Sequence, residues 1–224
     1  MLQNPLNLQK QLSSRLIIAI DGPSASGKGT LAKMLANHFA LPYLNTGALY
    51  RGVALQIIEQ HLNLENFENY MFDLVQNLTK LNLDNPNLFD EKTGAMASII
   101  AKSFKFRNLL LDFQKNFVKN SVDNNMGCVL DGRDTTTVIC PDADIKFFIT
   151  ADVEIRATRR FNQQQEFSYQ EILQQLKDRD FNDFNRQVAP LKITKDAKII
   201  DNGNLTIEQG FQQALSYINS KIKL

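Results

Sequence analysis

The chain has 224 residues, a formal net charge of +1 and 43% hydrophobic residues. This length suits one well-packed α/β domain with a small insertion, and a charge so near neutral gives no bulk electrostatic case for binding nucleic acid or a membrane surface. The sequence contains no run of eighteen apolar residues, so no membrane span is expected.

The start of the chain is polar. Residues 1–15 contain no apolar stretch of the kind that a secretory signal requires. We interpret them as an N-terminal extension, and we expect a cytoplasmic protein.

A glycine-rich turn between an apolar stretch and a helical pattern is the strongest feature of the chain. Residues 16–21 (LIIAID) predict a short buried strand, and the turn 22–27 (GPSASG) leads directly into Lys28, Gly29 and Thr30. Glycines in such a turn let backbone N–H groups approach phosphate oxygens, and the N-terminus of the following helix adds its dipole. Lys28 can then reach the β- and γ-phosphates of a nucleotide, and Thr30 supplies a hydroxyl for Mg2+. The pattern predicts a phosphate-binding P-loop.

Apolar segments and helical patterns alternate along the rest of the chain. Further strands are expected at 43–45, 126–131, 145–150 and 197–201. Helices are expected after the P-loop to residue 39, at 46–60 with Thr46 as its cap, at 67–78, 93–103, 104–122, 152–162 and 168–182, and from 206 to near the C-terminus; 81–91 predicts a loop. Strands that alternate with helices form parallel sheets covered on both faces, so the expected fold class is α/β with a five-stranded parallel sheet.

The cysteine and histidine residues predict no metal site. Cys128 and Cys140 lie beside apolar stretches without a second cysteine pair, so buried reduced thiols are expected rather than a disulfide framework or a zinc site. His38 and His61 lack the spacing of metal ligands, and each is expected on a helix surface.

Arginine residues recur where a phosphate would need them. Arg133 directly follows a predicted strand, at the edge of the sheet where α/β proteins bind ligands. Arg51 follows a predicted turn. Two further sets each share one face of a predicted helix: Arg156, Arg159 and Arg160, and Arg179, Asp183 and Arg186. Planar guanidinium groups suit an enzyme that moves a phosphoryl group, because they neutralise charge spread over several oxygens.

These acidic and basic residues also have plainer interpretations. Three arginines on one helix face are commonly solvated, and Arg179 with Asp183 has the spacing of an ordinary i,i+4 ion pair.

Asp131, at the end of an apolar strand, suits a Walker-B-like ligand of Mg2+ or of its waters. Asp21 could serve similarly, or it could merely cap the loop.

Five separated blocks resemble the bacterial cytidylate (CMP) kinase family. They are IDGPSASGKGT (20–30), LNTGALYR (44–51), LDGRD (130–134), VICPDADIKFFITA (138–151) and RQVAPL (186–191). The resemblance extends from about residue 16 over nearly the whole chain. It implies a P-loop NTP hydrolase-like three-layer sandwich, in one nucleoside monophosphate kinase domain over 16–224. A CMP-binding insert at 62–122, shorter than usual, and a lid at 155–186 are implied within that domain.

The resemblance implies a (d)CMP kinase of pyrimidine metabolism, which transfers the γ-phosphoryl group of ATP to CMP or dCMP. Mg2+ is the implied cofactor, and the implied protein is a monomer without a nucleic-acid or membrane partner. The acceptor is itself an ionised phosphate, so the chemistry needs no general base.

The same resemblance assigns roles to individual residues. ATP would be held by Gly22, Pro23, Ser24, Ala25, Ser26, Gly27, Lys28, Gly29 and Thr30. Mg2+ would be held by Thr30 and Asp131. CMP would be held by Thr46, Arg51, Ser98, Arg107, Arg133, Asp134, Arg179, Asp183 and Arg186. The catalytic set would be Lys28, Arg133, Arg156, Arg159, Arg160 and Arg186.

Base choice is the implied role of Asp134. Its carboxylate can accept a hydrogen bond from the exocyclic amino group of cytosine, which uracil lacks, and such a site rejects the analogue strongly.

The chain departs from the family at three places. Asn45 replaces an acidic residue. After 130–134 (LDGRD) the family has a glycine before a threonine, whereas this chain has Thr135, Thr136 and Thr137, and the loss of the glycine could shift the loop that holds Asp134. Residues 80–92 are too few for the usual β-hairpin, which bears most on Ser98.

Two other functions remain to be weighed. One is a P-loop kinase acting on UMP, AMP or a non-nucleotide, which Asp134 and Arg107 disfavour because they suit an aminated pyrimidine. The other is a degenerate P-loop protein that binds nucleotide without turnover, which the intact set of Lys28, Thr30, Asp131 and lid arginines disfavours.

Overall fold

The structure is a computed structural model and describes residues 15–82, 85–163 and 167–222. The expected N-terminal extension, apart from Arg15, and residues 164–166 of the expected lid lie outside the described residues. The chain forms two compact units. The first takes in the chain up to Leu44 and again from Val118, and the second is Asn45–Phe117.

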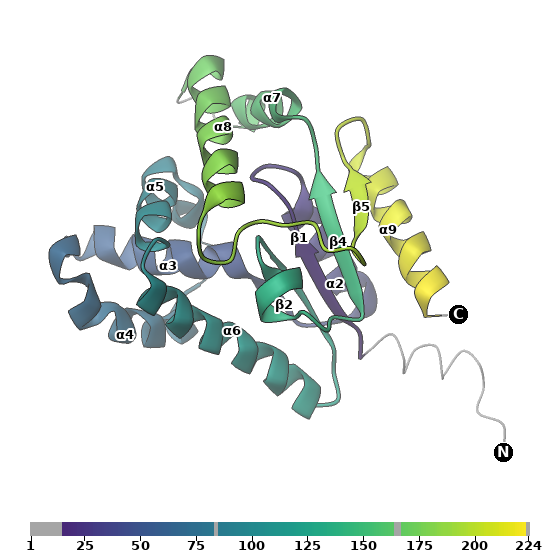
Figure 1. The fold of residues 1–224 in the computed structure, drawn as a ribbon, viewed down its shortest axis with the longest axis horizontal. Helices are drawn as coiled ribbons and strands as arrows, with labels where there is room; N and C mark the ends of the chain where they lie inside the picture. The colour runs from purple at the N-terminus through teal and green to yellow at the C-terminus, as the bar shows by residue number, and fades with distance from the viewer. Residues whose placement is uncertain (1–14, 83–84, 164–166, 223–224) are drawn as a thin grey trace. The chain divides into compact units, whose positions relative to one another are not determined.

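The first unit is built on a parallel five-stranded sheet with strand order β2-β3-β1-β4-β5 (Figure 1). The strands are β1 Ile17–Asp21, β2 Tyr43–Asn45, β3 Cys128–Gly132, β4 Ile145–Thr150 and β5 Lys198–Asp201. All five expected strands are confirmed, each within two residues. The central strand, β1, is among the most apolar, because a strand flanked on both sides and covered on both faces meets almost no water.

The α-helices that lie wholly within the described part of the first unit are α2 Lys28–Phe39, α7 Val153–Gln163, α8 Tyr169–Asn185 and α9 Ile207–Lys221. Helices α2 and α9 pack on one face of the sheet, where alternate residues of β1 and β4 meet buried residues of both helices. The strands point their carboxyl ends towards α7 and α8 (Figure 1). Those two helices share a small core of Ala157, Ile172 and Leu176, which Ala25 of the P-loop joins.

The second unit is helical. Its helices are α3 Thr46–Glu59, α4 Phe67–Asn77, α5 Glu91–Ile100 and the first part of α6 Phe104–Asp123, with 3-10 turns at Leu64–Asn66, Leu78–Lys80 and Pro86–Phe89. Phe106 is fully buried and packs edge-on against Phe67 and Tyr50. Within 62–122, the described residues contain no strand, in agreement with the expected absence of the β-hairpin.

Three helices differ clearly from the expectation at their ends. Helix α5 spans Glu91–Ile100 rather than 93–103. Helix α3 is capped by Asn45, whose side chain accepts from the N–H of Ala48, and not by Thr46, which is already its first helical residue. Asparagine at this position satisfies one of the unpaired N–H groups of the first turn. Helix α8 continues to Asn185, three residues beyond 182. Asp183 in that added turn is ion-paired to Arg133, a tertiary contact that local sequence does not reveal.

Both cysteines are buried free thiols, as expected, and burial raises the pKa of Cys128 to about 11. Among the helices in the described part of the chain, none is long and apolar enough to span a bilayer.

Candidate active site

The P-loop has the backbone geometry that its glycines permit. A side chain at Gly22 would collide with the carbonyl oxygen of Ile149 on β4, so this position admits only glycine. Gly27 has φ +88° and forms the N-cap of α2, which begins at Lys28. Ser26 is buried, and its hydroxyl has no hydrogen-bond partner among the described residues. A loop at a helix N-terminus that carries a buried hydroxyl without a hydrogen-bond partner among the described residues is suited to bind phosphate oxygens.

Two carboxylates at the strand ends lie on opposite faces of the sheet. Residues of β1 and β3 are paired so that Asp131 is opposite Ile20, and Asp21 is opposite Gly132. Because side chains alternate along a strand, Asp131 shares the face of Ile20, which α2 covers, whereas Asp21 points to the other face. Only Asp131 can therefore act beside the P-loop helix.

Asp131 is nearly fully buried and lies close to the start of α2. Its Oδ1 accepts a 2.6 Å hydrogen bond from the hydroxyl of Tyr43, and its Oδ2 would lie 3.7 Å from a Cβ placed on Gly29. Burial raises the pKa of Asp131, and the nearby Lys28 and the Tyr43 hydroxyl oppose that rise. Asp131 thus lies near the loop that would bind phosphate.

Lys28 is partly enclosed, and its Nζ lies 3.4 Å from the carbonyl oxygen of Pro23. Its pKa is lowered to about 7, first by burial and then by repulsion from Arg133, while Asp131 raises it. Positive charge is therefore concentrated here in excess of what the acidic groups neutralise. A polyphosphate would relieve this repulsion and restore the full charge of the lysine.

This lowered pKa makes a prediction for stability. Lys28 titrates near 7 when folded but near 10.5 when unfolded, so between these pH values the unfolded chain binds more protons and stability rises with pH. The penalty for Lys28 is complete below pH 7 and disappears towards pH 10.5. In thermal melts without ligand, Lys28→Met should raise Tm at pH 6.5 by at least about 2 °C, and by less at pH 9.5. An equal change in Tm at both pH values would contradict the assignment.

An alternating chain of charges crosses from β3 to the end of α8. The Nε of Arg133 donates to Asp183 Oδ2 at 2.7 Å, and Asp183 Oδ1 lies 3.8 Å from Arg186 Nη1. The Nη2 of Arg186 lies 3.8 Å from Asp134 Oδ2. Burial would raise the pKa of Asp183, but Arg133, together with Arg179 and Arg186, holds it below its usual value. The expected residues of this set are thus assembled around the strand end after β3.

The structure separates the three arginines that the helical spacing placed on one face of α7. Arg156 is buried, donates to the carbonyl oxygens of Ala151 and Ser24 and forms a two-pronged ion pair with Asp180 on α8, at 2.6 and 3.2 Å. The plainer interpretation, a solvated face, is wrong for this residue. Arg156 joins α7, α8 and the P-loop from inside the fold.

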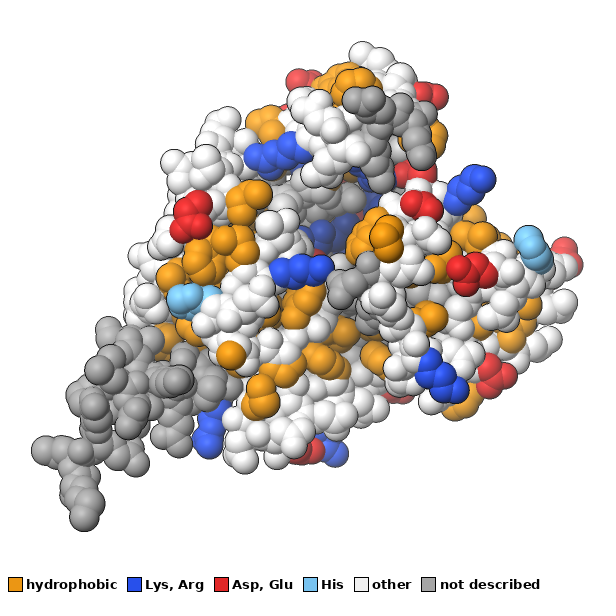
Figure 2. Space-filling view, turned by 180° about the vertical axis from the view of Figure 1, so that it is seen from behind, with side chains coloured by type: hydrophobic (Ala, Val, Ile, Leu, Met, Phe, Trp, Pro, Cys, Tyr) orange, Lys and Arg blue, Asp and Glu red, His pale blue; other side chains and the backbone are white. Residues whose placement is uncertain are grey.

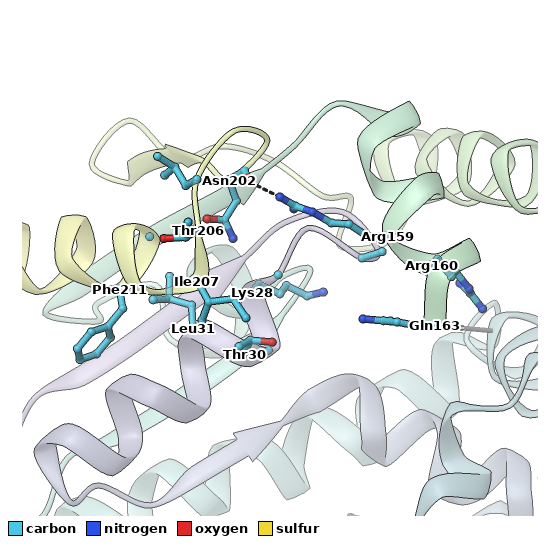
Figure 3. A pocket seen from close by; sticks show the side chains of 15 residues that line it. Lys28, Thr30, Leu31, Arg159, Arg160, Gln163, Asn202, Thr206, Ile207 and Phe211 are labelled. Atoms are coloured by element: carbon cyan, nitrogen blue, oxygen red, sulfur yellow. Dashed lines mark hydrogen bonds between the residues drawn. The ribbon is translucent and has the colours of Figure 1, made fainter. Parts of the chain in front are cut away.

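Arg159 and Arg160 instead line a cavity of about 540 Å³ beside the P-loop (Figure 3). One Nη of Arg159 donates to the carbonyl oxygens of Asn202 and Gly203, at 2.7 and 3.0 Å. The cavity walls come from the P-loop and α2, from α7, and from the β5–α9 junction: Ala25, Gly27, Lys28, Gly29, Thr30, Leu31, Arg159, Arg160, Gln163, Asn202, Leu205, Thr206, Ile207, Gly210 and Phe211. Polar groups at one end and apolar side chains at the other suit a phosphate that carries an organic base.

Sequence reasoning missed Asn202 and Tyr43. The Nδ2 of Asn202 donates to the carbonyl oxygen of Ser26, and its side chain fills the space that glycine leaves at Gly27 and Gly210. Asn202 follows β5 at the carboxyl edge of the sheet, so the rule that ligands bind at that edge could have identified it. Tyr43 had no comparable signal, since its contact with Asp131 joins strands far apart in the sequence.

Four of the expected acceptor residues belong to the helical second unit. Arg51 donates to the carbonyl oxygens of Leu88 and Asp90, at 2.7 and 3.2 Å, and Gly94 leaves space for its guanidinium. Arg107 is buried, with its guanidinium 5.6 Å from the ring centre of Tyr50. Two smaller side chains complete the set: Thr46 is buried in the first turn of α3, and the hydroxyl of Ser98 donates to Gly94 O.

Charge on the surface is mixed. Figure 2 shows acidic and basic side chains interspersed over one face of the molecule, in keeping with the net charge of +1. Attraction for an anionic ligand therefore depends on the local cluster around Lys28 and Arg133 rather than on the charge of the whole protein.

Comparisons with known proteins agree with this geometry. A profile of the family described as cytidylate kinase matches residues 18–220. A cytidylate kinase of Bartonella tribocorum is 42% identical over 215 residues, which cover 93% of this chain and 96% of that protein. A cytidylate kinase of Bradyrhizobium sp. (strain ORS 278) is 41% identical over 209 residues, covering 92% and 96%. A solved structure of an uncharacterized protein from Eubacterium ventriosum shares the fold, with TM-score 0.54 and 18% identity over 92% of this chain and 99% of that one.

Proposed function

The chain belongs to the cytidylate kinase family, and we propose that it transfers the γ-phosphoryl group of ATP to CMP or dCMP at the carboxyl edge of its sheet. The observation that carries this proposal is the cluster of Lys28, Asp131, Arg133 and Asp183, whose charges act on one another around an intact P-loop. All of these residues come from one chain, and we propose that a monomer suffices.

ATP is the proposed occupant of the P-loop and of the cavity beside it. The amides after Gly22 and the start of α2 would hold the phosphates, and the apolar end of the cavity, at Leu31, Ile207 and Phe211, suits the adenosine part. Arg159 and Arg160 on the opposite wall would face the phosphates. Arg156 would act indirectly, because it holds the carbonyl of Ser24 and thereby the shape of the loop.

Mg2+ fits the donors that the site offers. Thr30 is exposed at the start of α2, and the Asp131 carboxylate lies near the preceding Gly29, so both residues offer the oxygen ligands that this ion prefers. No cluster of three or more acidic, His or Cys residues suited to a metal occurs among the described residues, which agrees with an ion that takes most of its ligands from phosphates and water. When bound, it would neutralise charge on the transferring group.

The acceptor nucleotide would be bound by the charge chain after β3. Arg133 and Arg186 would bind its phosphate, Arg179 and Asp183 its ribose, and Asp134 its amino group. The family resemblance also implies acceptor-binding roles for four residues of the second unit, Thr46, Arg51, Ser98 and Arg107. The attacking phosphate oxygen is already ionised at neutral pH, so positioning and charge neutralisation are the whole of the required chemistry.

A panel of acceptors tests the proposal. With Mg-ATP and ADP release as the readout, CMP and dCMP should turn over, and UMP, AMP and GMP should be slower by at least about a hundredfold in kcat/KM. UMP has a carbonyl oxygen where cytosine offers its amino group to Asp134, and AMP and GMP carry larger purine bases. Comparable rates with all five would keep a nucleotide kinase but remove base selection from Asp134. ATP binding without turnover of any acceptor would favour the degenerate binding module instead.

A further inference from the structure

Asp21 ends β1, one residue before the P-loop, and is fully buried. Its Oδ1 accepts from the N–H and the hydroxyl of Thr135, at 2.9 and 2.8 Å. Its Oδ2 accepts from the N–H and the hydroxyl of Thr136, at 2.8 and 2.7 Å. A carboxylate has about four acceptor positions, so these hydrogen bonds occupy the group completely. Asp21 therefore has no capacity left for Mg2+, and of its two expected uses only a capping role fits, directed at another segment of the chain.

The segment that Asp21 caps is the helical turn Thr135–Ile139. The turn closes when the N–H groups of Val138 and Ile139 donate to the carbonyl of Asp134, which leaves the first amides of the turn without an acceptor inside it. Asp134 occupies the capping position, but its side chain makes no capping hydrogen bond. Its carboxylate is instead directed to Arg186, at 3.8 Å. Asp21 thus caps the turn in place of the residue that would ordinarily do so.

The threonines suit this arrangement better than the glycine that the family resemblance led us to expect. None of Thr135, Thr136 and Thr137 is among the described non-glycine residues with positive φ, so the backbone needs no glycine at these positions. The hydroxyls of Thr135 and Thr136 each add a hydrogen bond to a buried charge. The concern that losing a glycine would shift this loop is therefore not supported.

We infer that Asp21 is a positioning residue for the acceptor nucleotide: by capping the turn 135–139, it fixes the backbone from which Arg133 and Asp134 project. This inference rests on the proposed function, because it assumes that these two residues bind CMP.

The threonine side of the contact provides the cleanest test. Replacing both Thr135 and Thr136 by Val keeps their shape and removes two hydroxyl groups from Asp21 without changing β1. Hydrogen bonds to a charged group are worth enough that we expect kcat/KM for CMP to fall by about tenfold or more. KM for ATP should stay within about twofold, and the preference for CMP over UMP should narrow, because base reading is the property most sensitive to the place of Asp134. Replacing both residues by Ser instead keeps the two hydroxyl groups, so kcat/KM for CMP and the preference for CMP over UMP should stay near the wild-type values.

Thr137→Val is the matched control. Thr137 lies in the same turn, and its hydroxyl has no hydrogen-bond partner among the described residues, so this change removes no hydrogen bond. Unchanged CMP kinetics in Thr137→Val and altered kinetics in the double variant are the expected pair. The inference is overturned if the folded double variant keeps the wild-type preference for CMP over UMP, or if its losses for ATP and CMP are equal.

Hydrogen–deuterium exchange tests the anchor independently of activity. Asp21→Asn replaces one carboxylate oxygen by an NH2 group, which can no longer accept the hydrogen bonds that a threonine donates to that oxygen. The backbone amides of 134–140 should therefore exchange at least about tenfold faster than in the wild type. Asp144→Asn is the control, since Asp144 accepts from the N–H of Ile17 at the opposite end of β1. Unchanged exchange in Asp21→Asn refutes the anchor. A wild-type protein that phosphorylates no acceptor refutes the proposed function instead, whatever the exchange result.

Discussion

Lys28→Met is expected to lower kcat for CMP phosphorylation by at least about a hundredfold while the protein stays folded. The lysine ammonium lies among Asp131, Arg133 and Asp183 at the start of α2, where the γ-phosphoryl group would be transferred. Negative charge redistributes over that group in the transition state, and a fixed positive charge stabilises it more than it stabilises bound ATP. Methionine keeps most of the length of the side chain and removes the ammonium group, with its charge and its three N–H donors.

The control for this variant is Lys33→Met. Lys33 is an exposed lysine in the middle of α2, so the substitution removes one positive charge from the same helix without touching the P-loop. Steady-state assays with saturating Mg-ATP and CMP should show wild-type kcat for Lys33→Met. Near-normal turnover in Lys28→Met, together with a cooperative thermal melt, would mean that Lys28 does not act on the transferring phosphoryl group.

The fold was largely predictable because buried parallel strands are nearly continuous apolar runs. Apolar runs as short as those of β1 and β4 fit few structures other than a buried strand. Turn or capping residues on either side mark where each strand begins and ends. The P-loop was predictable for a related reason, since its function requires particular residues at adjacent positions. Both the strands and the P-loop depend on residues that are adjacent in the chain, so both can be predicted from the sequence.

Features that depend on register were not predictable. Asp21 and Asp131 both end apolar strands, and either suited Mg2+ from the sequence. Their different roles come from a one-residue offset between β1 and β3, which directs them to opposite faces of the sheet. Likewise, the spacing of the α7 arginines shows that they share a face, but not that Arg156 is buried against Asp180 while Arg159 and Arg160 line a cavity.

Long-range ion pairs formed the other gap. The plainer interpretation of Asp183 was an i,i+4 ion pair with Arg179 within one helix, and nothing in the sequence indicated a partner elsewhere in the chain. In the structure its carboxylate accepts from Arg133, fifty residues away, and that contact accompanies the extension of α8 to Asn185. The sequence therefore identified candidate residues of the site, but not the long-range ion pairs and hydrogen bonds between them.

Asp134→Ala is expected to reduce kcat/KM for CMP by about a hundredfold and to leave that for UMP unchanged or higher. The Asp134 side chain is mostly buried, at 13% exposure, so a hydrogen bond from its carboxylate to the cytosine amino group is poorly replaced by water. Uracil presents a carbonyl oxygen at the same place, which a carboxylate repels. Removing the carboxylate therefore withdraws an attraction from one substrate and a repulsion from the other.

Two further variants separate base reading from the ion pair with Arg186. Asp134→Ala also leaves Arg186 without this carboxylate, but that loss affects CMP and UMP alike, so the ratio of their kcat/KM values isolates the base. Asp134→Asn offers an oxygen acceptor and an amide donor, and we expect it to use UMP better than Asp134→Ala does. Asp142→Ala, at an exposed carboxylate nearby in the sequence, should change neither substrate. Equal losses for CMP and UMP in Asp134→Ala would show that Asp134 does not read the base, and base selection would then depend on the second unit.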